Sequence, residues 1–304
     1  MFHRFHSDGS GAPLQGSLSP ADFEKCLLFV GLDNILGPDQ WVSRLQTGTL
    51  EPSDLCLTFD DGLRTQIQYA LPVLEKYELG AFWFVCSTVF EGGTINSEIY
   101  SHAAAQMGGM DVLANTLLKQ CPDALRNQLN TGEFSRYQSK MMHLFPFYTQ
   151  QDCQFRFLRN SDQHKAIFEE LMDQVLAQHG LNALEIGEHL WMDREHLKYL
   201  AGAGHWVGLH SYNHPYAMDA LSYTEQKAEY QRNYDHLSNL TKIPPRSMSH
   251  PLNASNSDTL SILASLGIEC GFRSTMTPAP GMKVNAHSLM MAREDSTTLQ
   301  NLAQ

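Results

Sequence analysis

The stretch Leu55-Cys56-Leu57-Thr58-Phe59-Asp60-Asp61-Gly62 decides the fold that we expect for this chain. It is a short apolar run closed by two carboxylates and a glycine, a pattern typical of a buried β-strand that ends in a turn. Helical spacing follows over residues 71–77, and a second apolar run, residues 81–86, predicts the next strand. Strand followed by helix indicates an α/β fold whose parallel strands are joined by right-handed crossovers.

The same alternation returns in the last third of the chain. Residues 206–209 and 268–272 are apolar runs of strand length, and residues 259–266 have helical spacing. A capping box of Ser222 and Glu225 predicts a helix that reaches about residue 240, and Ser19 before Pro20 predicts an earlier helix start. If these strands close into a barrel, their carboxyl ends lie together at the face where barrel enzymes carry their chemistry.

Residues 92–190 break this alternation. They are mostly helical in pattern, most clearly over residues 112–120 and 166–178, and polar stretches join the helices. No linker rich in Pro, Gly or Ser divides the chain. We therefore expect one domain over residues 1–304, with a helical insertion at about 92–190 that adds packing or forms a wall or lid over the strand ends.

Charge and cysteine content narrow the classes of partner and compartment. The 304 residues include 21 Lys and Arg against 33 Asp and Glu, a net charge of −12, which argues against nucleic acid or an anionic membrane as the main partner. The start has no secretory signal, and no apolar run approaches the ~20 residues of a membrane span. The six cysteines lie far apart without a Cys-x-x-Cys pair, so we expect free thiols and a cytoplasmic location.

Asp60 and Asp61 are the first candidates for chemistry. Two adjacent carboxylates at the end of an apolar strand are costly unless they are paired, hydrated or bound to a metal ion. Their side chains point in different directions, so one can bind a cation while the other handles protons. The structural alternative is an Asp-Gly turn that the second aspartate solvates.

His210 and His214 are the second candidates. They lie four residues apart directly after the apolar run 206–209, so they can share one metal ion at a strand end. Taken alone, two histidines at this spacing are a weak signal. One carboxylate and two histidines make a three-ligand set with an open position, as in catalytic metal sites.

Together the two motifs resemble those of the NodB-type polysaccharide deacetylases, carbohydrate esterase family four. The resemblance covers about residues 54–91 and 190–295, and it rests on Thr58-Phe59-Asp60-Asp61-Gly62 followed by His210-Ser211-Tyr212-Asn213-His214. It implies a distorted (β/α) barrel and one divalent metal ion, expected to be zinc, held by Asp61, His210 and His214. It also implies that Asp60 is the catalytic base.

The third motif of that family, Arg-x-Pro-Tyr-Gly, is altered here. The matching residues 249–253 read Ser-His-Pro-Leu-Asn, and the backbone N–H of Leu252 is the expected oxyanion donor. The arginine that orients the base is missing from its usual place, and Arg293 is the candidate replacement. Its alternative partner is a surface carboxylate, Glu294 or Asp295.

The family's last motif supplies a histidine that protonates the leaving amine, and no clean match to it exists here. His250 and His287 are the two candidates for this general acid. His3 lies near the chain start, either at the barrel mouth or in an exposed N-terminus, and the exposed position is favoured.

The expected function is a metal-dependent N-deacetylase, a hydrolase of C–N bonds other than peptide bonds. It would remove acetyl from an acetamido sugar in cell-surface polysaccharide biosynthesis, for example of lipopolysaccharide. Without a signal peptide, a nucleotide- or lipid-linked precursor is the favoured substrate. Two alternatives stay open: another barrel metal hydrolase that cleaves a phosphoester or cyclic amide, and a non-catalytic carbohydrate-binding relative.

Overall fold

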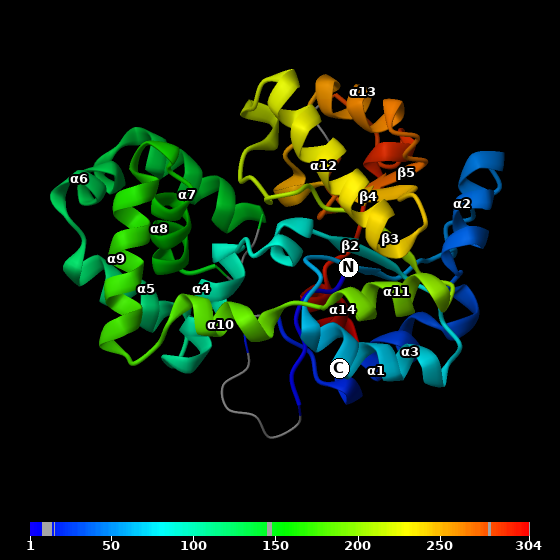
Figure 1. Ribbon diagram of the computed structural model, residues 1–304, viewed down its shortest axis with the longest axis horizontal. Helices are drawn as coiled ribbons and strands as arrows, with labels where there is room; N and C mark the ends of the chain where they lie inside the picture. The colour runs from blue at the N-terminus through cyan, green and yellow to red at the C-terminus, as the bar shows by residue number, and fades with distance from the viewer. Residues whose placement is uncertain (8–13, 15, 145–147, 279–280, 304) are drawn as a thin grey trace. The chain divides into compact units, whose positions relative to one another are not determined.

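Five parallel strands form one sheet in the order in which they occur along the chain (Figure 1). They are β1 (Thr58–Phe59), β2 (Phe82–Val85), β3 (Trp206–Leu209), β4 (Ser247–Ser249) and β5 (Cys270–Phe272). The structure is a computed structural model that describes residues 1–7, 14, 16–144, 148–278 and 281–303. The strands curl into a half-barrel with helices between them, which is the distorted (β/α) barrel predicted from the sequence.

The burial of strand β2 explains why its sequence is apolar throughout. All four of its residues are fully buried, because side chains leave a strand on alternating faces and both faces of this sheet are covered. On one face Trp83 stacks on Phe59 with ring centroids 4.2 Å apart. On the other face Phe82 and Phe84 pack with Phe272.

Helices α11 (Arg194–Gly202) and α12 (Tyr223–Thr241) pack against β3 (Figure 1). The predicted capping box is present, since Ser222 and Glu225 bond reciprocally at the start of α12. The predicted helix start at Ser19 is also present. Ser19 is the N-cap of α1, and its side chain accepts from the backbone N–H of Asp22. The remaining helices around the sheet are α1 (Pro20–Val30), α2 (Pro38–Thr47), α3 (Leu71–Lys76), α13 (Ser257–Ser265), α14 (Ser296–Leu302), the π-helix η2 (Gln66–Ala70) and the 3₁₀ turns η1 (Leu32–Asn34), η3 (Ser87–Glu91), η6 (Met218–Ala220), η7 (Pro251–Asn253) and η8 (Ser288–Met290).

The first strand is shorter than its apolar run predicted. Only Thr58–Phe59 are in β1, whereas Leu55 forms an isolated bridge with Ile35. The N-terminus also differs from its prediction. Phe2 is buried and pairs in parallel with Phe59, so the chain start extends the sheet instead of lying exposed.

By its contacts the chain divides into two compact units. One comprises residues 1–10, 16–95 and 191–304, and the other residues 11–15 and 96–190. The second unit is helical in its described part, and Tyr100, Phe155 and Phe168 form its aromatic centre through edge contacts. Its helices are α4 (Asn96–Gln106), α5 (Met110–Gln120), α6 (Asp123–Arg126), α7 (Gly132–Leu144), α8 (Gln150–Arg159), α9 (Lys165–Gln178) and α10 (Ala183–Leu190), with the 3₁₀ turns η4 (Asn127–Asn130) and η5 (Asp162–His164).

The state of the cysteines and the character of the helices bear on two further predictions. None of the six cysteines forms a disulfide, and five of them are buried. Among the described residues, no helix combines the length and the apolar character that crossing a membrane requires.

Candidate active site

Asp60 and Asp61 end β1 and diverge because the backbone turns sharply between them. Asp61 has φ +74° and Gly62 has φ +68°, both in the left-handed region. At Gly62 a Cβ atom would lie 3.1 Å from Cγ1 of Val85, so the turn requires glycine there for its conformation and its close approach to β2. The turn sends the two carboxylates to different partners.

Asp60 is held by Arg293 in a bidentate ion pair. Nη1 of Arg293 donates to Oδ1 at 2.7 Å and Nη2 donates to Oδ2 at 2.6 Å, and both side chains are buried. The hydroxyl of Ser249 donates to Oδ2 at 3.0 Å. Burial alone would raise the pKa of Asp60, but the charge and hydrogen bonds of Arg293 outweigh it and hold that pKa well below its usual range. Asp60 is therefore ionised at neutral pH.

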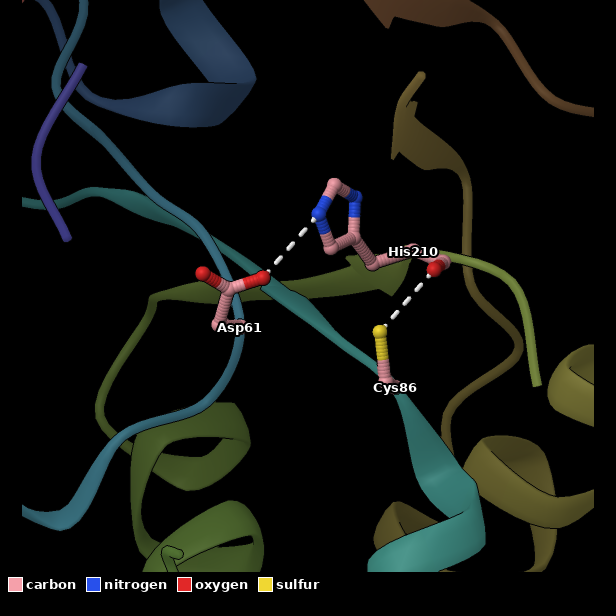
Figure 2. A group of neighbouring side chains, drawn as sticks. All are labelled: Asp61, Cys86 and His210. Carbon is pink, nitrogen blue, oxygen red and sulfur yellow. Dashed lines mark hydrogen bonds and ion pairs between the residues drawn. The ribbon is translucent and has the colours of Figure 1, made fainter. Parts of the chain in front are cut away.

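Asp61 faces the two histidines. Its Oδ1 lies 3.3 Å from Nε2 of His210 and 3.7 Å from Nε2 of His214, and the two rings are 4.9 Å apart between centroids. Figure 2 shows the Asp61 carboxylate pointing at the His210 ring. Burial alone would raise the pKa of Asp61, but the hydrogen bond and charge of His210 and the charges of His3 and His214 keep it below its usual range.

This donor set fits a divalent metal ion. Nδ1 of His210 lies 2.9 Å from the carbonyl oxygen of Ser249, and because a carbonyl only accepts, Nδ1 carries the proton. In the neutral ring Nε2 then presents a lone pair toward the Asp61 carboxylate, so that either a proton or a metal ion can be shared between these two atoms. Anchoring of Nδ1 on a carbonyl is also the usual outer-shell support of a metal-bound histidine. One carboxylate and two imidazoles suit zinc and its first-row neighbours.

Helix α12 holds the loop that carries the two histidines. Asn233, which is fully buried, accepts from the backbone N–H of His210 at 3.0 Å and donates to the Val85 carbonyl at 3.0 Å. One turn earlier, Glu229 accepts from the backbone N–H groups of Tyr212 at 3.1 Å and Asn213 at 2.8 Å. The loop needs this support because two of its residues have strained left-handed conformations, namely Ser211 (φ +62°) and His214 (φ +55°).

The two histidines named from the sequence as general acids lie in different surroundings. Nε2 of His250 lies 2.7 Å from the carbonyl oxygen of Leu289, and burial lowers the pKa of His250 to about 4. Nδ1 of His287 accepts from the backbone N–H of Leu289, so this ring caps η8. In the described part of the chain, no hydrogen bond or ion pair joins either ring to Asp60 or Asp61.

Leu252 lies in η7, directly after β4. Its backbone is left-handed (φ +52°), and its side chain is half exposed. Because Leu252 is the second residue of this short helix, its N–H is one of those that have no partner inside the helix. Among the described residues, no backbone carbonyl accepts a hydrogen bond from this N–H, which lies just after the carboxyl end of β4.

His3 is the residue whose place the sequence analysis missed. Its Nε2 lies 3.8 Å from Oδ2 of Asp60, and its side chain is 29% exposed. The side-chain amide of Gln66 donates to the carbonyls of both His3 and Asp60, at 2.7 and 2.6 Å. The sequence signal was the pair Phe2 and Phe5, which are both buried and bring His3 to the sheet.

Comparisons with known proteins identify a family and a fold. The family profile described as "Polysaccharide deacetylase" matches residues 47–135 and 159–271, which is about two thirds of the chain. Both histidines of the site and both aspartates lie inside the match, whereas His3 and Arg293 lie outside it. None of the proteins with curated functions matches the sequence.

Solved structures share the fold at low sequence identity. The deacetylase PplD of Streptococcus pyogenes is 16% identical, with a TM-score of 0.58 over 99% of this chain and 94% of its own. IcaB from Ammonifex degensii is 15% identical, with a TM-score of 0.52 over 100% of this chain and 94% of its own. A de-N-acetylase from Aggregatibacter actinomycetemcomitans is 13% identical, with a TM-score of 0.53 over 99% of this chain and 97% of its own.

Proposed function

Because the chain belongs to the polysaccharide deacetylase family, we propose that it hydrolyses the acetamide group of an N-acetylated sugar with the help of a divalent metal ion. The observation that carries this proposal is the division of labour between two adjacent carboxylates. Asp60 is paired with Arg293, and Asp61 faces two histidines. The altered third motif therefore does not leave the base without an arginine partner.

Asp61, His210 and His214 are the residues that would hold the metal ion, and zinc suits their oxygen and nitrogen donors. When bound, such an ion lowers the pKa of a water ligand and polarises the acetyl carbonyl. Helix α12 keeps the histidine loop in place for this task through Asn233 and Glu229.

Asp60 is the proposed base. Arg293 fixes both carboxylate oxygens, so the side chain stays ionised and oriented while it accepts a proton from the attacking water. The N–H of Leu252 supports the oxyanion that develops on the acetyl oxygen.

We propose His3 as the general acid in place of His250 and His287. A histidine with a pKa of about 4 is neutral at pH 7, so His250 is not the imidazolium that could protonate the leaving amine. The one N–H of its neutral ring, at Nε2, already donates to the carbonyl of Leu289. His287 serves as a helix cap. Among these three histidines, His3 is the one that lies close to Asp60 and is also partly exposed to solvent.

Replacing His3 with glutamine should lower kcat by about 100-fold with little change in KM or metal content, because the amide cannot protonate the leaving nitrogen. His6→Gln is the matched control, since His6 contacts Ser17 instead of Asp60. The loss should be smaller for an N-acetyl substrate analogue with a better leaving group. Equal activity of wild type and His3→Gln on the natural amide would rule His3 out.

The proposed substrate is an acetamido sugar, free or linked to a nucleotide or lipid, used in cell-surface polysaccharide biosynthesis. The net charge of −12 supports a small or neutral substrate over a polyanion. We further propose that residues 92–190 are a helical insertion within one deacetylase domain, a proposal supported by the compact unit that residues 96–190 form.

Product analysis tests the reaction class. Metal-loaded protein incubated with N-acetylated sugars should release acetate and free amine in equal amounts. Inorganic phosphate or a ring-opened product would instead identify a different barrel hydrolase. Sugar binding without any product would identify a non-catalytic carbohydrate-binding relative.

A further inference from the structure

We propose that Cys86 is an additional ligand of the metal ion, so that the site contains a sulfur donor beside Asp61 and His210 and takes the water of the proposed function as a fifth ligand. The ligand atoms of these three residues all lie within 4.8 Å of one another, and all three residues are buried. Figure 2 shows Asp61 at the ring of His210 and the sulfur of Cys86 at its backbone oxygen. They follow β1, β2 and β3, which are neighbours in the sheet, so the sheet itself brings the sulfur to the metal site. This inference rests on the metal site of the proposed function.

Charge balance favours a thiolate at this position. Asp60 and Arg293 neutralise each other, so Asp60 is not available to compensate a metal ion. With Asp61 (7% exposed) as the one remaining carboxylate and the imidazoles of His210 (3%) and His214 (9%) neutral, a divalent ion would leave an excess positive charge in a largely buried site. A Cys86 thiolate brings the sum of the buried charges to zero.

The present contact of the thiol is one that metal binding can replace. Sγ of Cys86 donates to the backbone carbonyl of His210 at 3.0 Å, and a thiol is a weak hydrogen-bond donor. On ligation the S–H bond breaks, a sulfur–metal bond forms, and the proton leaves to solvent. No oxidant or reductant is involved.

A sulfur ligand changes which metals the site prefers. Thiolates select zinc over magnesium and manganese, whereas carboxylates and waters suit the latter two. Cys86→Ser should therefore weaken zinc affinity by at least about tenfold and leave manganese affinity nearly unchanged. Cys26→Ser, at another buried free cysteine, is the matched control and should leave both affinities unchanged.

Cobalt substitution gives a direct readout that does not depend on activity. The Co²⁺-loaded wild type and Cys26→Ser should show a sulfur-to-cobalt charge-transfer band in the near ultraviolet. Cys86→Ser and Cys86→Ala should bind Co²⁺ without that band, and circular dichroism should confirm that both are folded.

The outcomes separate this inference from the proposed function. Bound cobalt without the band in wild type, or a band that persists in Cys86→Ser, would overturn the sulfur ligand alone. No bound cobalt in any variant would overturn the metal site of the proposed function, and the sulfur ligand with it.

Discussion

Asp60→Asn is expected to lower kcat by about 10²- to 10⁴-fold while the protein keeps its metal ion. Asparagine has nearly the shape of aspartate, but its amide accepts no proton from the attacking water. The metal content should persist because Asp60 contacts Arg293 and Ser249, whereas Asp61 faces the histidines. Acetate release at saturating substrate, together with metal analysis of the same sample, measures both effects.

The adjacent carboxylate supplies the matched control. Asp61→Asn should lose metal and activity together, because it removes the charged oxygen that faces His210 and His214. Wild-type kcat in Asp60→Asn would exclude Asp60 as the base. Loss of metal from Asp60→Asn would instead mean that the two aspartates do not have separate tasks.

Arg293→Met is expected to lower the free energy of unfolding by about 3–5 kcal/mol, because it leaves the buried Asp60 carboxylate without its cation. Urea unfolding at pH 7 measures this loss. Arg246→Met is the control, since Arg246 pairs with Glu269 while half exposed, and it should cost no more than about 1 kcal/mol. The double variant Asp60→Asn with Arg293→Met should recover part of the loss, because no unpaired charge stays buried.

The pH dependence follows from the sign of the Asp60 shift. Its pKa is lowered in the folded protein, so its contribution to stability is present above the unfolded pKa of about 3.9 and is lost as the pH falls below it. In Arg293→Met, burial without the arginine raises that pKa, so protonation favours the folded state. The difference in the free energy of unfolding between the wild type and Arg293→Met should therefore become smaller as the pH falls toward 4. If that difference in the free energy of unfolding did not depend on pH, the ion pair of Asp60 and Arg293 could not be its cause.

Strands made only of apolar residues could be predicted from the sequence, and a polar strand could not. Strand β3 was predicted with its observed bounds, because burial on both faces leaves a continuous apolar run. Strand β4 was missed because two of its three residues are serines. Ser249 is polar for a reason of its own, since its hydroxyl donates to Asp60 and its carbonyl anchors His210. A strand that serves the site does not follow the apolar pattern of its neighbours.

Some residues of the site can be identified from short sequence motifs, and others only from the folded structure. Asp60, Asp61, His210 and His214 lie in short motifs, so the sequence alone names them. From the sequence Arg293 was only a candidate and His3 was favoured as exposed, because their positions depend on pairings between distant segments, namely Met291 with Phe272 and Phe2 with Phe59. The same holds for Asn233 and Glu229, because a polar face of α12 looks like any solvated helix until the histidine loop is placed on it.

Metal stoichiometry of the purified protein and of His210→Ala tests most directly whether Asp61, His210 and His214 form a metal site. We expect about one divalent ion per wild-type chain after supplementation, and little or none in His210→Ala, which removes one of the ligands. His189→Ala, at an exposed histidine of α10, should bind the ion like the wild type. A wild type without stoichiometric metal, or a His210→Ala variant that binds it equally well, would contradict the site.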